Sequence, residues 1–139
     1  MSFGPQWDEM DSQSRYSMTA LSREQLPITA GVYALYREGE RQYVGKAACL
    51  RDRVWGNHSG RGASMTNSAM RRNIAEHLGI TTAADIKARR HQPTEAEAQR
   101  VRTWLDGCEI AWRTCPDEAA AVALETAMKR EARPPLTRR

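Results

Sequence analysis

The stretch GVYALYREGERQYVGKAACLRDRVWGNH, residues Gly31–His58, decides the fold of this chain. In its first seven positions, Val32, Ala34 and Tyr36 alternate with Tyr33 and Leu35. A period of two places these two sets on opposite faces of a strand. A single central glycine, Gly39, then separates this run from a second strand-like run at 41–46. The remainder of the stretch is typical of a short helix. It therefore predicts an antiparallel hairpin that leads into a helix.

The length of the hairpin loop decides where two tyrosines lie. A three-residue loop over 37–39, with Gly39 in the left-handed conformation, places Tyr33 opposite Tyr43 on one face of the sheet. A two-residue loop shifts the register by one residue and sends the two phenols to opposite faces. We expect the three-residue loop, and with it two phenols side by side.

A second block, CEIAWRTCPDEAAAVALETAMKREARPPLTRR, begins at Cys108. It indicates a short strand at 109–115, a break, and a helix from about Glu118 for which Asp117 supplies the N-cap. The Pro-Pro pair near the end stops this helix, because the residue before a proline disfavours the helical conformation.

Together the two blocks resemble the GIY-YIG nuclease superfamily, and they cover about half of the chain. Its two tripeptides are matched by GVY at 31–33 and, ten residues later, by YVG at 43–45; YVGKA is closest to the excision-repair nuclease domain. Arg53 stands ten residues after Tyr43, where the superfamily has an arginine. The last block matches in Glu125, Lys129 and the RPPL close. The resemblance implies a stand-alone nuclease domain of the α+β class, with a small three-stranded antiparallel sheet (31–37, 41–46, 109–115) flanked by helices.

The resemblance also implies a chemistry, namely divalent-metal-dependent hydrolysis of DNA phosphodiester bonds. Glu125 would be the metal ligand for Mg2+, with Mn2+ as an alternative, since magnesium accepts few protein ligands and keeps several waters. Arg53 would hold the scissile phosphate, a task that suits a planar guanidinium. Tyr33 would be the general base, although a phenol needs nearby cations to lower its pKa from about 10. Tyr43 would orient or pack, and Lys46 would orient the nucleophile or contact phosphate.

Two positions depart from the superfamily pattern. The superfamily has His or Tyr four residues after the arginine, where this chain has Asn57, and His58 follows one residue later. In an α-helix that slip turns the imidazole well away from Arg53, at about 100° per residue, unless the helix ends early at Gly56. We keep His58 as a candidate catalytic residue. Thr137 stands where the superfamily has asparagine, and its side chain has a shorter reach.

Charge favours a polyanionic partner. The 139 residues fit one domain, and 21 Lys and Arg against 17 Asp and Glu give a net charge of +4 and a pI near 9.2. Lysines and arginines that contact phosphates would make DNA binding depend on salt. The candidate contacts are Arg51, Arg61, Arg71, Arg72 and Lys129.

Residues 1–26 are polar and lack strong periodicity, so we expect an N-terminal arm that is loosely held, followed by the nuclease-like domain at 27–139. Within that domain, about 68–107 form a helical insertion in which we expect substrate selection. Three helices are indicated there: one with an apolar face that ends at Gly79, a short one from Thr82 to Arg90, and one that begins with the capping box Thr94-x-x-Glu97.

The three cysteines, Cys49, Cys108 and Cys115, are odd in number and lack close paired spacing. The last two would lie too far apart along one strand to form a disulfide, so we expect free thiols in a reducing cytoplasm. No apolar run approaches the roughly 20 residues of a membrane-spanning helix, which predicts no membrane partner.

Two other functions fit the sequence. One is a DNA- or RNA-binding module that keeps the fold without cutting, which the shifted histidine and the missing asparagine favour. The other is a subunit whose basic face binds a partner protein. The presence together of Tyr33, Tyr43, Arg53 and Glu125 favours cleavage over both, because a binding module needs no carboxylate facing phosphate. The target, the choice between a nick and a double-strand break, the biological role and the choice between monomer and homodimer stay open.

Overall fold

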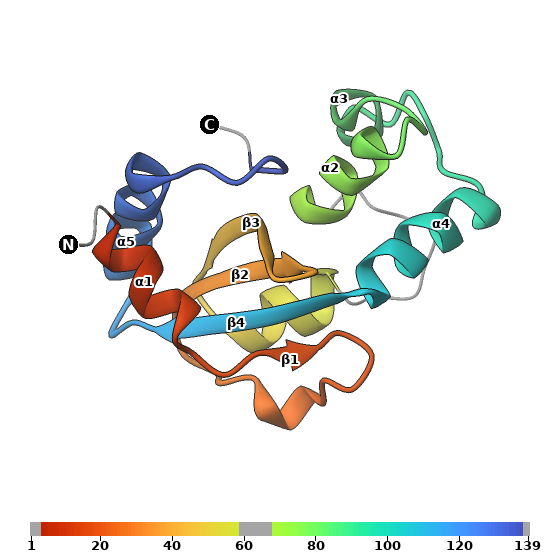
Figure 1. Cartoon of the computed structure of the whole chain (residues 1–139). Helices are drawn as coiled ribbons and strands as arrows, with labels where there is room; N and C mark the ends of the chain where they lie inside the picture. Colours follow the sequence, from red (N-terminus) through yellow and green to blue (C-terminus); the bar gives the residue numbers. More distant parts are fainter. Residues whose placement is uncertain (1–3, 59–67, 138–139) are drawn as a thin grey trace.

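The computed structural model describes residues 4–58 and 68–137, apart from the side chains of residues 57 and 58. A central antiparallel sheet is flanked by helices, which places the fold in the α+β class (Figure 1). In chain order the elements are α1 (Pro5–Asp11), β1 (Tyr16–Ser17), η1 (Arg23–Gln25), β2 (Gly31–Arg37), β3 (Glu40–Ala47), η2 (Arg51–His58), α2 (Ala69–His77), α3 (Ala83–Lys87), α4 (Glu95–Asp106), β4 (Cys108–Thr114) and α5 (Glu118–Glu131).

The sheet has four strands in the order β1-β4-β2-β3, so the expectation of three strands is wrong in number. The three expected strands are present as β2, β3 and β4. The fourth, β1, is two residues long and pairs Tyr16 with Ile110 of β4. A strand that short carries no alternation of polar and apolar residues, so the sequence gives no signal for it.

The hairpin between β2 and β3 turns through two residues, so the expected three-residue loop is wrong. Glu38 and Gly39 both have positive φ, 53° and 79°, and Arg37 pairs with Glu40. A positive φ at both central residues is typical of a type I′ turn, whose twist matches that of the adjoining strands. This loop alone would place Tyr33 opposite Val44, and a bulge in β3 moves its partner to Gly45, so Tyr33 does not lie opposite Tyr43.

A bulge in β3 nevertheless returns the two phenols to one face. The register shifts between Leu35 and Tyr36, which leaves Gln42 of β3 as an extra residue. Beyond the bulge Leu35 pairs with Tyr43, so Tyr43 lies diagonally from Tyr33 on the same face. The centroids of the two tyrosine rings are 6.1 Å apart. The two-residue loop and the bulge compensate for each other.

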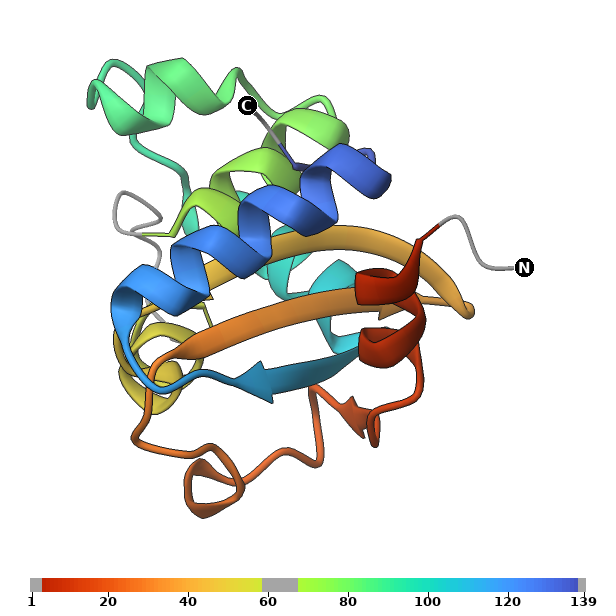
Figure 2. The same ribbon diagram turned by 90° about the vertical axis from the view of Figure 1, so that its left-hand side faces the viewer.

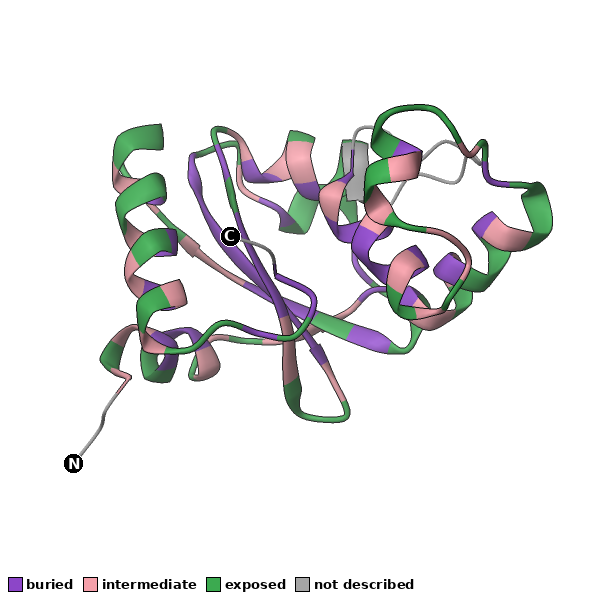
Figure 3. Cartoon of the chain, turned by 90° about the horizontal axis from the view of Figure 1, so that it is seen from above, coloured by how far each residue is buried: buried purple, intermediate pink, exposed green. Residues whose placement is uncertain are grey.

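The sheet has a hydrophobic core on each face. Tyr33 and Leu35 of β2 face a core to which α2, α4 and Leu50 contribute. The alternate residues of β2 face a second core, to which α1 and α5 contribute. Figure 2 shows α5 along the β2–β3 hairpin. The helix α1 contacts the C-terminal end of α5. Figure 3 shows the buried strands at the centre of the molecule.

The N-terminal segment is packed onto the rest of the chain, so the expectation that it is loosely held is wrong for residues 4–26. Trp7 is fully buried, and its indole N–H donates to the backbone carbonyls of Met128 and Ala132, each at 2.9 Å. The carboxylate of Glu131 accepts from the backbone N–H groups of Gln6 and Trp7. The first helix is thereby attached to the last turn of α5.

Three helices lie within residues 68–107, and the beginnings of the second and the third agree with the sequence signals. The side chains of Thr82 and Thr94 accept from the backbone N–H three residues on, and Thr94 forms the full capping box. The helix α3 ends at Lys87, short of the expected Arg90, since Arg89 adopts a left-handed φ of 61°.

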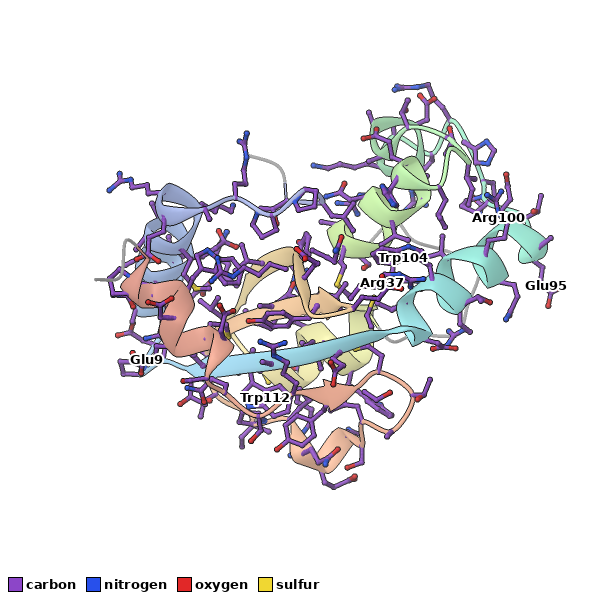
Figure 4. The ribbon with its side chains drawn as sticks, in the orientation of Figure 1. Glu9, Arg37, Glu95, Arg100, Trp104 and Trp112 are labelled. Atoms are coloured by element: carbon purple, nitrogen blue, oxygen red, sulfur yellow. The ribbon has the colours of Figure 1, made fainter. Side chains whose placement is uncertain are left out.

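A contact between Arg37 and Trp104 joins the sheet to the end of α4 (Figure 4). The guanidinium of Arg37, at the end of β2, donates to the backbone carbonyl of Trp104 at 2.6 Å. It also lies 4.8 Å from the centre of the Trp104 ring, within range of a cation–π interaction. This contact holds the C-terminal end of α4 against the end of β2.

The three cysteines are free thiols, as expected. Within the described ranges, none of the helices combines the length and the apolar character needed to cross a membrane.

Candidate active site

A cavity of about 370 Å³ lies at β3, the edge strand of the sheet, where elements from both faces meet. Its walls come from the β2–β3 hairpin, η2, α2, α3, α5 and the C-terminal segment. The lining residues are Tyr33, Tyr43, Val44, Gly45, Lys46, Arg53, Ala69, Arg72, Asn73, Ala83, Ala84, Lys87, Glu125, Lys129 and Thr137.

The two phenols form the floor of this cavity. The side chains of Tyr33 and Tyr43 are 1% and 8% exposed. Tyr33 of β2 pairs with Gly45 of β3. A Cβ added at Gly45 would lie 2.5 Å from the hydroxyl oxygen of Tyr33. Such a contact is too short for any side chain, so glycine at this position lets the phenol reach the cavity.

Burial raises the pKa of Tyr33 well above 10, and the neighbouring phenol of Tyr43 raises it further. The positive charge of Arg53 opposes this shift, whereas a hydrogen bond with Tyr43 and the charge of Glu125 add to it. Burial also raises the pKa of Tyr43, but the hydrogen bond with Tyr33 lowers it.

Glu125 brings a carboxylate to the cavity from the opposite face of the sheet. Ala121, Glu125 and Met128 form the buried side of α5, with the first and last of them in the core. Glu125 is 7% exposed, and its Oε1 lies 3.0 Å from Nζ of Lys129 and 3.7 Å from Nζ of Lys46. Among the described residues that line the cavity, it is the sole acid.

Basic side chains dominate the cavity. Lys46, Arg53, Arg72, Lys87 and Lys129 line it against the single carboxylate. Burial lowers the pKa of Arg72, the Tyr43 phenol opposes this shift, and the charge of Arg53 adds to it. Two guanidinium groups therefore face the same space, an arrangement that attracts an anion.

The helix that carries Arg53 is a π-helix through His58, which changes the spacing expected for an α-helix. In a π-helix the backbone bond joins residue i to residue i+5. Residues 53 and 58 are five positions apart, which is the spacing of that bond. In a π-helix, backbone positions five residues apart therefore lie closer to the same side of the helix than they do in an α-helix. The side chain of His58 lies outside the described residues.

The C-terminal segment closes the cavity along β3. The backbone N–H of Leu136 donates to the carbonyl of Gln42, the bulge residue, at 2.9 Å, and the side chain of Asn73 donates to the carbonyl of Leu136 at 2.8 Å. Thr137 is buried, and its hydroxyl oxygen accepts from the backbone N–H of Val44 at 2.9 Å. Thr137 therefore acts here as an acceptor that fixes the segment to the strand.

The proposed DNA contacts fall into separate groups. Arg72 and Lys129 line the cavity, whereas Arg71 is buried and does not line it. Arg51 donates from Nε to the backbone carbonyl of Leu26, which attaches η2 to the N-terminal segment. Arg61 lies outside the described residues.

Two polar residues that line the cavity were not singled out from the sequence, Lys87 and Asn73. Lys87 lies in the last turn of α3, whose Thr82 cap was recognised, so the basic residues of that helix were the available signal. Asn73 follows Arg72 on α2, and its contact with Leu136 depends on a segment more than sixty residues away. No local pattern encodes such a contact.

The donor set fits a magnesium ion that has one protein carboxylate. Within the described ranges, no three His, Cys, Asp or Glu residues are grouped as a multidentate metal site would require. Magnesium often binds through one or two carboxylates and substrate phosphates, and it keeps its remaining waters. Glu125 in a basic cavity provides one such carboxylate with space beside it.

The cavity thus combines two buried phenols, one carboxylate and five cations, which can bind a phosphate and move a proton near it. No family model, curated protein or solved structure matches the chain. The function of the protein is therefore inferred from the geometry of the cavity and from the motif residues that line it.

Proposed function

We propose that this protein is a divalent-metal-dependent endonuclease of the GIY-YIG type that hydrolyses DNA phosphodiester bonds. The observation that carries the proposal is a convergence across the edge of the sheet. Glu125 from α5 and Arg53 from η2 line one cavity with Tyr33, Tyr43 and Lys46, although they come from opposite faces of the sheet. The free thiols are in keeping with a cytoplasmic protein.

The cations of the cavity would bind and orient the scissile phosphate. Arg53 can offer two parallel N–H donors to phosphate oxygens, and Arg72 lies at the same wall. In a partly buried site such donors stabilise the charge that develops on phosphorus oxygens more strongly than they would in water.

The phenols would manage the proton of the attacking water. Ionised Tyr33 is the proposed base, and the charge of Arg53 favours its ionised form. Tyr43 is hydrogen-bonded to Tyr33 and would orient that phenol. The side chain of Thr137 contributes indirectly, since it fixes the segment that covers β3.

Glu125 would hold Mg2+ or Mn2+ at this cavity. When bound, such an ion supplies Lewis-acid stabilisation of the phosphate and of the leaving oxygen. Lys129 and Lys46 pair with Oε1 of Glu125, and both lysine side chains are long enough to turn toward an incoming phosphate.

The test is cleavage of supercoiled plasmid with Mg2+ or Mn2+ by the wild type and by Glu125→Gln. This substitution removes the charge and keeps the shape of the side chain. The wild type should nick or linearise the plasmid, whereas Glu125→Gln should bind DNA without cutting it. Glu118→Gln is the matched control, because Glu118 lies in the first turn of the same helix, is exposed and does not line the cavity.

Three outcomes would contradict parts of the proposal. Metal-dependent cutting by Glu125→Gln at the wild-type rate would remove Glu125 from the mechanism. Salt-sensitive binding without cutting by the wild type would favour a DNA- or RNA-binding module. The specific observation in favour of that module is that Glu125 pairs with two lysines. Absence of nucleic-acid binding would favour a subunit that binds a protein partner.

A further inference from the structure

A second hollow, of about 430 Å³, lies beside the candidate active site on the C-terminal part of α5. It is lined by Thr126, Lys129, Arg130 and Arg133. Lys129 lines this hollow and the catalytic cavity alike, so the two are neighbours along the helix. Three cations and a hydroxyl group, without an acid among them, form the surface that leads away from Glu125.

The nearby carboxylates are directed away from these arginines. Glu125 pairs with Lys129 and Lys46 inside the catalytic cavity. Glu131 accepts from the backbone N–H groups at the start of α1. Among the described residues neither Arg130 nor Arg133 forms an ion pair, so both guanidinium groups remain available to an anion.

Helix stability explains only part of this arrangement. Cations in the last turn of a helix interact favourably with its dipole, and this accounts for Lys129 and Arg130. Arg133 lies beyond Glu131, the last residue of α5, yet it lines the same hollow. A dipole effect does not require Arg133 and Thr126 to share one concave surface with the other two side chains.

We propose that this hollow binds backbone phosphates of the DNA strand next to the scissile phosphate, so that the strand runs along α5 from Glu125 toward Arg133. The inference rests on the proposed function. Glu125 and Glu131 are six residues apart in α5, which is about 9 Å at 1.5 Å per residue. The two steps from Glu131 to Arg133, through the extended Ala132, add at most about 7 Å. B-form DNA has one phosphate per roughly 3.4 Å along each strand, so the contacts fall within about five nucleotides of the cut.

The test measures how DNA binding depends on salt, using a fluorescent duplex without divalent metal so that nothing is cut. For a protein that contacts phosphates, log K falls linearly with log salt, with a slope of about −0.9 per contact. Arg130→Ala with Arg133→Ala should make the slope shallower by about 1 to 2 and weaken binding at low salt.

Three further variants separate a local contact from net charge and from folding. Arg23→Ala with Arg100→Ala removes the same charge from residues on η1 and on α4, far from α5 (Figures 1 and 4), and should leave the slope unchanged. Arg130→Lys with Arg133→Lys should keep most of the slope, because lysine retains the charge. Residue 133 lies outside α5, so Arg133→Ala alone does not disturb the helix. This single substitution should still make the slope shallower by about 0.9.

The outcomes for this inference and for the proposed function are distinct. Equal slopes for the wild type and the Arg130 and Arg133 variants, or an equal change in the Arg23 and Arg100 variant, would overturn the path along α5 even if plasmid is cut. A shallower slope without cutting by the wild type would support the path and contradict the endonuclease. Absence of DNA binding at low salt would overturn both.

Discussion

At the scale of single residues, Tyr33 makes a testable demand on pH. Burial is the main reason that its pKa lies well above 10, so the base is almost fully protonated at neutral pH. Below that pKa the ionised fraction rises about tenfold per pH unit, and the rate of cleavage should rise with it between about pH 6 and 9. Tyr33→Phe should lower the rate by roughly 10² to 10⁴. A rate that levels off near pH 7 in the wild type would exclude the Tyr33 phenolate as base.

Gly45 makes a second demand, this time on space. An added Cβ would lie 2.5 Å from the hydroxyl oxygen of Tyr33 and 2.6 Å from its ring carbon Cζ. Gly45→Ala should therefore cost about 1–3 kcal/mol of unfolding free energy through overpacking, and it should displace the phenol and abolish cleavage. Gly56→Ala is the control, since no described atom lies within 4 Å of its added Cβ. Urea unfolding and plasmid cleavage measure both effects, and an active Gly45→Ala enzyme would remove the need for a fixed Tyr33.

The sequence indicated the main chemistry-bearing residues but not every neighbour. The spacing between Tyr43 and Arg53 and the placement of Glu125 identified residues that meet in one cavity. Arg71 and Arg72 show the limit, because adjacent residues on a helix point about 100° apart and a basic pair does not reveal which one is buried. The face of α2 that meets the core is set by packing against distant residues.

At the scale of elements, the hairpin turn offers a stabilising change. Glu38 adopts a positive φ of 53°. This conformation is unfavourable for most residues that have a Cβ, and asparagine, aspartate and glycine adopt it more readily. Glu38→Asn creates the Asn-Gly pair preferred in type I′ turns, and it should raise the free energy of unfolding by about 0.5–1 kcal/mol. Thermal unfolding of the two proteins checks this. Glu40→Asn, after the turn, should give no such gain.

Local signals predicted helix ends better than strand register. Each cap at Thr82, Thr94 and Asp117 forms as the sequence indicated, since a cap depends on residues three positions apart. The register of β2 and β3 depends instead on the bulge at Gln42, whose carbonyl accepts from Leu136. Because that partner lies more than ninety residues away, the hairpin sequence alone favoured the wrong loop.

At the scale of the whole molecule, the candidate site depends on both cores. Residues of the Tyr33 face and residues of α5 meet in the cavity at β3, the edge strand of the sheet. The helix α5 is positioned in turn by α1, whose seven residues are too few for a stable isolated helix. Packing therefore decides whether α1 forms, which is why residues 1–26 had the sequence pattern of a loose arm.

Trp7 tests that dependence. It is fully buried and bonded through its indole N–H to two carbonyls at the end of α5, so Trp7→Ala should cost about 3–5 kcal/mol of unfolding free energy. Ile28→Ala is the control, since Ile28 is 69% exposed and should change stability by no more than about 0.5 kcal/mol. Urea unfolding followed by circular dichroism measures both. A loss for Trp7→Ala as small as that for Ile28→Ala would mean that α1 opens without unfolding the sheet. A large loss would make the N-terminal segment part of the unit that holds Glu125 at the cavity.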